Sequence, residues 1–108
     1  MREFKQIVIR AMLPHIILLE TGNQPLYGYA LIKLIRKKHG VYLGPSTVYP
    51  ALCELEKQGL IKSDWVVYEA GKHRPHKLYT ITNKGRILLG QTTSVLAFVN
   101  KTMIEVKT

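Results

Sequence analysis

The chain has 108 residues, 46% of them hydrophobic, which is enough for one compact domain with a single core. Its net charge of +9 indicates a polyanionic partner, but charge alone does not separate nucleic acid from an anionic membrane surface or a merely basic soluble protein. The one cysteine, Cys53, excludes an internal disulfide, and the N-terminus lacks the pattern of a secretory signal. These features predict a reducing, cytoplasmic setting.

Residues 3–20 are predicted to form the first helix, and their apolar side chains are too many for one narrow stripe, so the helix is covered on two sides. Pro14 cannot donate an interior helical hydrogen bond, so the helix is either kinked there or begins again near Leu13. The apolar stretch from Ile7 to Leu19 is interrupted and shorter than the about 20 apolar residues of a membrane span. We therefore expect no transmembrane segment and no membrane partner.

The second predicted helix runs from Tyr27 to His39 and is amphipathic. Its core face carries Ala30, Leu31, Leu34 and Ile35, and its remaining surface carries Lys33, Arg36, Lys37 and Lys38. Cations in the last turn stabilise the negative end of the helix dipole, and they could equally contact phosphate. The sequence leaves both roles open.

The third predicted helix ends at Gln58 and Gly59. Its core face consists of Val48, Ala51, Leu52 and Leu55. The opposite face carries Ser46, Pro50, Cys53 and Lys57, flanked by Tyr49 and Glu54. Small and polar side chains with one aromatic ring suit a helix that enters a groove. Helix propensity alone would begin this helix near Pro50.

Two strands with alternating polarity are predicted at 65–69 and 77–81, so they form a hairpin. Their connection, residues 70–76, is rich in cations and holds no acid. Thr82 is the predicted N-cap of a last helix from about Asn83 to Val106, which carries a loose apolar stripe. The predicted fold is mainly α with a small β-hairpin.

Three helices followed by a basic-tipped hairpin form a winged helix-turn-helix. The third helix would present its outer face to the major groove, where base edges carry sequence information. The hairpin is the wing, and its cations would meet phosphate or the minor groove. We therefore predict double-stranded DNA as the partner.

The order of the motifs resembles the PadR family of transcription regulators. The segments PLYGYAL at 25–31, GPSTVYPAL at 44–52, LEKQGLI at 55–61 and KLYTITNKG at 77–85 carry the resemblance, which covers roughly residues 16–85. It implies a winged domain, residues 1–81, followed by one dimerisation helix, residues 82–108, that pairs with the first helix of another subunit. It also implies a dimeric regulator, often a repressor, and a recognition helix that begins several residues before Pro50.

The resemblance implies DNA contacts at the start of the recognition helix from Ser46, Thr47, Tyr49 and Pro50, and wing contacts from Lys72, Arg74 and Lys77. We add Tyr27, Cys53, Lys57 and His73 as candidate DNA contacts. The candidate dimer residues are Ile7, Met12, Leu88, Val95, Phe98, Val99, Met103 and Val106. A small lipophilic or aromatic effector between the subunits is a further family property, without residues here that identify a pocket.

Two positions depart from the family pattern. Glu54 stands where a basic residue is common, and we expect its carboxylate to point to solvent rather than to accept a hydrogen bond from cytosine. Gly44 stands where a capping serine is frequent, so Ser46 is expected to cap the helix instead.

Other classes of function have weaker support. His73, His76 and Cys53 are too few for a structural zinc site, which needs four ligands, so we expect no metal and no cofactor. The sequence has no glycine-rich phosphate loop or nucleophile elbow, and we expect no enzyme. A winged helix used as a protein-interaction module, or one that binds nucleic-acid ends by shape, remains an alternative.

Overall fold

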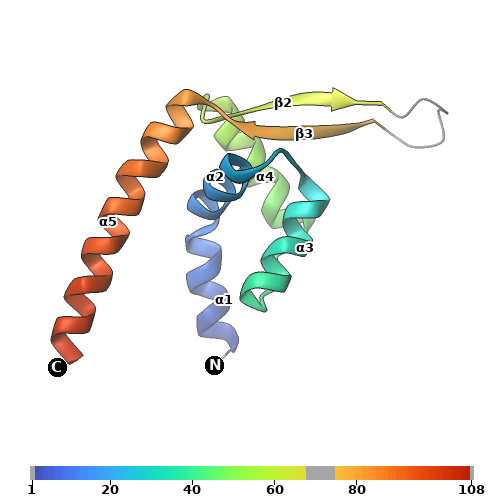
Figure 1. The fold of residues 1–108 in the computed structure, drawn as a ribbon. Coiled ribbons are helices and arrows are strands. Elements are labelled where there is room, and N and C mark those ends of the chain that lie inside the picture. Colours follow the sequence, from blue (N-terminus) through green and yellow to red (C-terminus); the bar gives the residue numbers. More distant parts are fainter. Residues whose placement is uncertain (1, 68–74, 108) are drawn as a thin grey trace.

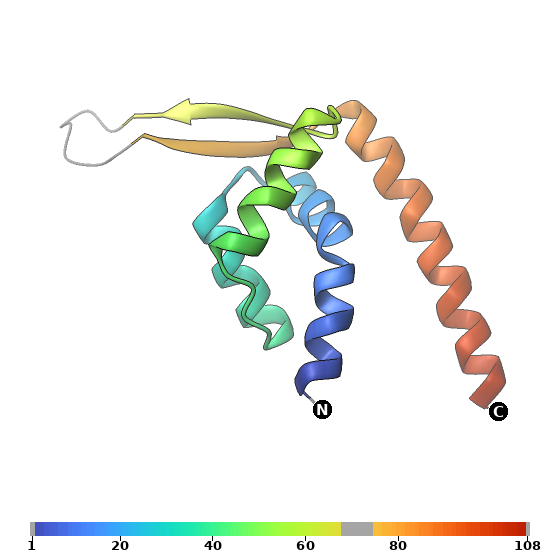
Figure 2. The ribbon, with the colours of Figure 1, turned by 180° about the vertical axis from the view of Figure 1, so that it is seen from behind.

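The computed structural model describes residues 2–67 and 75–107. Helices and a small sheet form a body from which one long helix extends (Figures 1 and 2). The elements are α1 (Arg2–Ala11), α2 (Leu13–Asn23), β1 (Leu26–Tyr27), α3 (Gly28–His39), α4 (Pro45–Lys57), β2 (Ile61–Val66), β3 (His76–Ile81) and α5 (Asn83–Lys107). No helix among these residues is long and apolar enough to cross a membrane. The predicted mainly α fold with a β-hairpin is confirmed.

The core lies between α2, α3, α4 and the sheet. Side chains from each of the three helices are excluded from water almost completely, among them Ile17, Leu31 and Leu52. The predicted core faces of α3 and α4 are confirmed, because their apolar residues are either buried or packed against the buried cluster. Burial of this kind contributes about 1.5–3 kcal/mol per large aliphatic side chain, so the body has its own core.

The first helical segment is two helices and not one kinked helix. Met12 separates α1 from α2, and Pro14 lies in the first turn of α2, where its missing N–H has no helical acceptor to lose. Of the two alternatives that the sequence left open, the new start near Leu13 is the observed one.

The sheet has three antiparallel strands in the order β1-β3-β2, one more than the sequence predicted. The two-residue β1 pairs Leu26 with Tyr79. β2 begins at Ile61, four residues before the predicted start at Trp65, because Ile61 is buried and pairs with Ile81. β3 begins at His76, which the sequence assigned to the connection. Residues 68 and 69 of the predicted first strand lie outside the described residues.

The start of α5 is fixed tightly to the end of the sheet. The hydroxyl of Thr82 accepts a hydrogen bond from the backbone N–H of Gly85 (3.1 Å) and donates one to the carbonyl of Gly59 (2.6 Å), so the predicted N-cap is confirmed. A Cβ atom at Gly85 would lie 2.1 Å from the carbonyl oxygen of Leu60. Only glycine permits this approach of α5 to the backbone just before β2.

Beyond its first turns α5 leaves the body, and its far end lies apart from α1 (Figures 1 and 2). The half that packs does so against α2, where His15 Nδ1 lies 2.9 Å from Thr92 Oγ1. The hydroxyl of Thr92 donates to the carbonyl of Leu89, so it accepts a hydrogen bond from the histidine ring. This bond links α2 to α5.

Candidate nucleic-acid interface

The helix predicted to read DNA, α4, begins at Pro45 with Gly44 as its N-cap. The family-like early start is confirmed, and Pro50 lies inside the helix. The expectation that Ser46 caps the helix is wrong, because Ser46 is the second helical residue and the cap position makes no side-chain hydrogen bond. Pro45 at the first position lacks an N–H, which removes one of the donors that a cap would serve.

The outer face of α4 is open to solvent. Ser46, Tyr49, Pro50, Cys53 and Lys57 are exposed, and Thr47 is half-buried. Glu56, seven residues after Tyr49, lies at the edge of this face; it is half-buried, accepts a hydrogen bond from Ser63 and lies beside Lys77. Glu54 is exposed, accepts a hydrogen bond from Gln58 Nε2 (3.1 Å) and lines a hollow on the side of α2 and α5. Its carboxylate therefore lies off the outer face, as expected.

The side chain of Tyr49 is partly packed against the start of α3 and partly exposed to solvent. Its side chain is 40% exposed, yet its ring lies so close to the start of α3 that a Cβ atom at Gly28 would be 2.5 Å from Tyr49 Cε1. The glycine of the PLYGYAL segment is thus required by the tyrosine of α4. The covered part of the ring fixes Tyr49, and the rest of the side chain is open to a partner.

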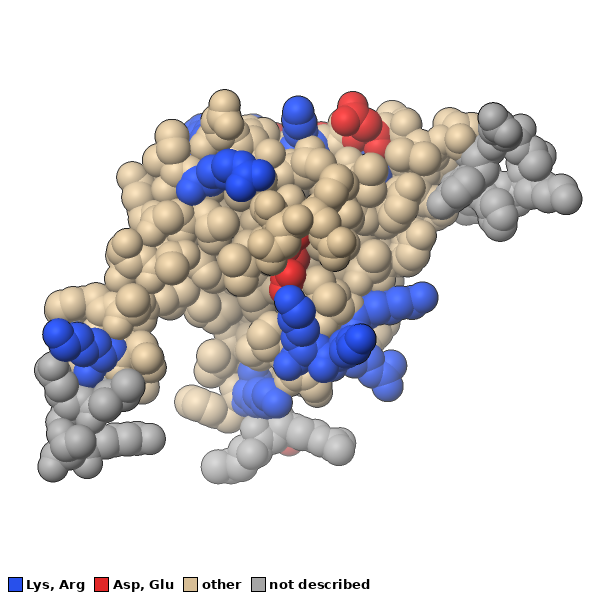
Figure 3. Space-filling model, in the orientation of Figure 1, with Lys and Arg blue, Asp and Glu red and all other residues tan. Residues whose placement is uncertain are grey.

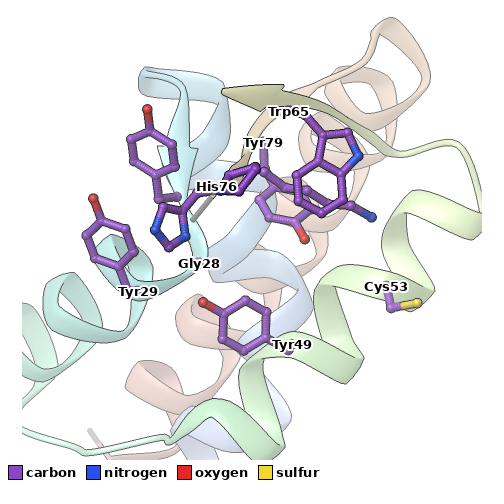
Figure 4. Close-up of a pocket in the computed structure, with 10 residues that line it drawn as sticks. Gly28, Tyr29, Tyr49, Cys53, Trp65, His76 and Tyr79 are labelled. Carbon is purple, nitrogen blue, oxygen red and sulfur yellow. The ribbon is translucent and has the colours of Figure 1, made fainter. Parts of the chain in front are cut away.

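An aromatic hollow of about 360 Å³ lies between α4, the start of α3 and the hairpin (Figure 4). Its lining residues are Tyr27, Gly28, Tyr29, Tyr49, Cys53, Trp65, Pro75, His76, Lys77 and Tyr79. Sequence reasoning missed this hollow, because the residues come from five elements and only the unpredicted strand β1 brings Tyr27 beside His76. Burial, followed by the nearby charge of Glu56, raises the pKa of Tyr79 above its ordinary value of 10.0.

The described part of the wing contributes two cationic or titratable side chains to this region. Lys77 Nζ lies 5.3 Å from the centroid of the Trp65 ring and 3.9 Å from Glu56 Oε1. His76 is half-buried with its ring edge-on to Tyr29. Lys72, His73 and Arg74 lie outside the described residues. Among residues 2–67 and 75–107, no three His, Cys, Asp or Glu side chains gather as a metal site would require.

The basic end of α3 has a partly structural explanation. Lysine and arginine side chains gather over this end in Figure 3, where the last turn carries Arg36, Lys37 and Lys38. Lys38 Nζ lies 2.8 Å from Glu20 Oε2, and the glutamate side chain is only 6% exposed. One of these cations therefore neutralises a buried carboxylate of α2, while Arg36 and Lys37 are exposed.

A second surface is apolar and lies on α1 and α5. Of the candidate dimer residues, Ile7, Val95, Phe98, Val99 and Met103 are exposed, while Met12 and Leu88 pack partly against the core. Phe98 is the most exposed of them at 71%. The side chain of Val106 lies outside those described. Beside this surface an apolar hollow of about 500 Å³ separates α5 from α2 and α4.

Taken together, the three helices, the three-stranded sheet and the open outer face of α4 define a winged helix-turn-helix protein. Residues 17–91 match the model of the family described as the transcriptional regulator PadR-like family, and the chain belongs to that family. The resemblance seen in the sequence is thereby confirmed.

The chain is also similar to individual proteins and solved structures. The chain is 29% identical over 96 residues to the transcriptional regulator Rv3488 of Mycobacterium tuberculosis, covering 89% of this chain and 82% of that protein. It is 31% identical over 90 residues to an uncharacterized 37.1 kDa protein in a transposon of Streptomyces fradiae, covering 83% of this chain and only 24% of that protein's length. A PadR family transcriptional regulator of Eggerthella lenta superposes with a TM-score of 0.80 at 28% identity, covering 92% of this chain and 84% of the other.

Proposed function

We propose that this protein is a homodimeric, sequence-specific DNA-binding regulator that represses transcription in the cytoplasm from a palindromic operator. The observation that carries the proposal is the outer face of α4, which is exposed and flanked by the wing, and whose neighbouring carboxylate, Glu56, is paired with Lys77. A net charge of +9 supports a polyanionic partner and disfavours a protein-interaction module, since the centres of protein interfaces are depleted in lysine.

In this proposal the first turns of α4 enter the major groove, with Ser46, Thr47, Tyr49 and Pro50 nearest the base edges. Lys57 and the wing residues Lys72, His73, Arg74 and Lys77 contact phosphates, which position the protein without reading sequence. Tyr27 and Cys53 complete the candidate contacts. The exposed Arg36 and Lys37 of α3 are available to the adjacent backbone, because the first helix of a helix-turn-helix crosses it.

The dimer is supported by the apolar surface of α1 and α5. Isolated apolar side chains are common on protein surfaces, but here exposed apolar side chains recur along each of the two helices, which supports an interface. Pairing α5 of one subunit with α1 of the other would cover both. By two-fold symmetry the recognition helices would then address half-sites about 34–36 Å apart. A lipophilic or aromatic effector between the subunits stays a prediction from the family.

Selection of bound sequences from random duplex DNA tests the proposal. We expect a palindrome with half-sites one helical turn apart. Enrichment of a single asymmetric site, or of no sequence at all, contradicts a dimeric sequence reader.

Salt titrations of operator binding test the wing. Lys72→Ala and Arg74→Ala should each weaken specific and random duplexes alike and reduce the salt slope by about 0.9. The control is Lys101→Ala, which removes the same charge from an exposed position of α5 far along the chain from the wing and α4. An equal loss of slope in the control would show that the effect is one of overall charge.

Operator affinity of Tyr49→Phe tests the recognition helix. Loss of a hydroxyl that donates to phosphate should cost about 1 kcal/mol of DNA affinity and leave thermal stability unchanged, because the ring still packs on Gly28. Unaltered affinity would remove Tyr49 from the DNA contacts.

A further inference from the structure

Glu56 is an acidic side chain between α4 and the hairpin, and it has no part in the proposed DNA contacts. It belongs to the last turn of α4, and its side chain is 33% exposed. Its Oε2 atom accepts a hydrogen bond from the hydroxyl of Ser63 in β2 (2.5 Å), and its Oε1 atom lies 3.9 Å from Lys77 Nζ in β3. The two oxygens of one carboxylate therefore face the two strands of the hairpin.

The hydrogen bond from Ser63 fixes the carboxylate of Glu56, whereas Lys77 is held loosely. The ammonium nitrogen of Lys77 is beyond hydrogen-bonding distance of Glu56. It lies 5.3 Å from the centroid of the ring of Trp65, the residue that pairs with Lys77 across the hairpin. The lysine side chain is 39% exposed. An ammonium group in this position is stabilised by the ring and the carboxylate, and it is able to move to a stronger anion.

The negative charge of Glu56 acts on the groups around it. Burial and then the charge of Glu56 raise the pKa of Tyr79, so the carboxylate disfavours a second negative charge nearby. Tyr79 and Lys77 line the aromatic hollow together with Tyr49 and Cys53 of the outer face of α4 (Figure 4). A phosphate that approached Lys77 from this face would therefore meet the field of Glu56 as well.

We propose that Glu56 competes with DNA phosphate for Lys77 and thereby lowers the affinity of the protein for every duplex. In the free protein Lys77 lies beside Glu56. In the complex the lysine turns to the backbone, and the carboxylate, fixed by Ser63, loses its partner. Because phosphate contacts carry no sequence information, specific and random duplexes are affected alike. This competition rests on the proposed function, in which Lys77 contacts a phosphate.

Glu56→Gln is the direct test, because the glutamine oxygen still accepts the hydrogen bond from Ser63 while the charge is lost. We expect this variant to bind a random duplex and a selected duplex about twofold to fivefold more tightly, the range of a partly exposed ion pair. Its salt slope should steepen by up to about 0.9. In the unaltered protein Glu56 takes up a cation when Lys77 leaves, which offsets one counterion released from the DNA. Unaltered or weaker binding overturns the proposal.

Glu54→Gln is the matched control, because it makes the same change of charge two residues away on α4. Glu54 is exposed, accepts a hydrogen bond from Gln58 and faces the hollow beside α2 and α5, away from Lys77. This variant should leave DNA affinity nearly unchanged. Equal tightening by the two variants would show an effect of overall charge and overturn the proposal. Circular dichroism confirms that both variants are folded.

Lys77→Met separates competition for the lysine from direct repulsion of DNA by the carboxylate. If Glu56 acts through Lys77, Glu56→Gln should change neither the affinity nor the salt slope of a protein that already carries Lys77→Met. The same tightening with and without the lysine would mean that Glu56 repels phosphate directly, and it overturns the competition.

Tripolyphosphate provides an arm of the test that needs no operator. Trp65 is the only tryptophan of the chain and Lys77 lies over its ring, so its fluorescence reports movement of the ammonium group. At one ionic strength, Glu56→Gln should bind tripolyphosphate more tightly than the unaltered protein does.

The arms distinguish failure of the competition from failure of the proposed function. If selection yields no preferred duplex while Glu56→Gln still tightens binding of random duplex and tripolyphosphate, the sequence reader fails and the competition stands. If the unaltered protein binds a selected duplex and Glu56→Gln changes neither affinity, the competition alone fails. Binding of neither DNA nor tripolyphosphate overturns both.

Discussion

The body of this protein and its two terminal helices differ in how far their apolar side chains are buried. In the body, formed by α2, α3, α4 and the sheet, large aliphatic side chains such as Ile17 and Leu52 are completely covered by the same chain. Along α1 and the second half of α5, side chains such as Ile7 and Phe98 are mostly exposed. The difference shows that the core of the body is covered by the same chain, whereas the terminal helices carry apolar surface that the chain itself leaves exposed, as the proposed dimer requires.

The strongest test of this difference is a cavity in the body. Leu52→Ala should lower the free energy of unfolding by about 2–5 kcal/mol, because the fully buried leucine leaves a void that its neighbours cannot fill. Urea unfolding followed by circular dichroism measures it. A loss below about 1 kcal/mol would show that the body is not a closed core.

On the terminal helices the same kind of truncation should act on association. Phe98→Ala should raise the dissociation constant of the proposed dimer by about a thousandfold, because a two-fold dimer loses two aromatic anchors at about 2 kcal/mol each, while the helical signal stays constant. Sedimentation over a range of concentrations checks this, with the exposed polar change Asn100→Ala as the control. A dimer that is insensitive to Phe98 would exclude this face.

Breaking the ion pair between Lys38 and Glu20 in the body should have a smaller effect on stability. Lys38→Met leaves the nearly buried carboxylate of Glu20 without its partner and should cost about 1–2 kcal/mol, less than a fully buried pair because the lysine side chain is 48% exposed. Lys37→Met, one residue away and exposed, should change stability by less than about 0.5 kcal/mol. Thermal unfolding of the two variants side by side separates the ion pair from the loss of a lysine.

The smallest expected effects on stability are at the N-termini of α5 and α4, which they distinguish. Thr82→Ala removes the cap of α5 and should cost about 1 kcal/mol, whereas Ser46→Ala in the first turn of α4 should be neutral within about 0.5 kcal/mol. Chemical unfolding at one protein concentration measures both. A cost for Ser46 equal to that for Thr82 would restore the serine as a cap.

Much of the fold could be predicted from local sequence. The apolar periodicity of α3 and α4 and the threonine before α5 act within one or two turns, so their signals lie close together in the chain. β1 could not be predicted, because two residues make a strand here only by pairing with Leu78 and Tyr79, far along the chain. The early start of β2 was not predicted either, because Lys62, Ser63 and Asp64 are all polar and do not alternate with apolar residues.

The candidate site also has a part that could be predicted from the sequence and a part that could not. The exposed residues of α4 follow from a helical wheel, and the sequence identified them. The aromatic hollow depends on the contact between Tyr49 and Gly28 and on the packing of β3 against β1, which no local pattern encodes. Single-sequence reasoning finds the face of an element more readily than a space enclosed by several elements.

The tight approach of Gly85 to Leu60 has a mechanical consequence. At about 1.5 Å of rise per residue, a helix the length of α5 extends roughly 37 Å, so a tilt of about 10° at its first turn displaces its last turn by roughly 6 Å. That displacement exceeds the rise of one base pair, about 3.4 Å along each strand. In the proposed dimer joined through α5, the direction of the helix is set by residues 82–85 and by its packing on α2. Substitutions that change this direction would therefore alter the operator spacing that the proposed dimer accepts without any change in the residues proposed to read the bases.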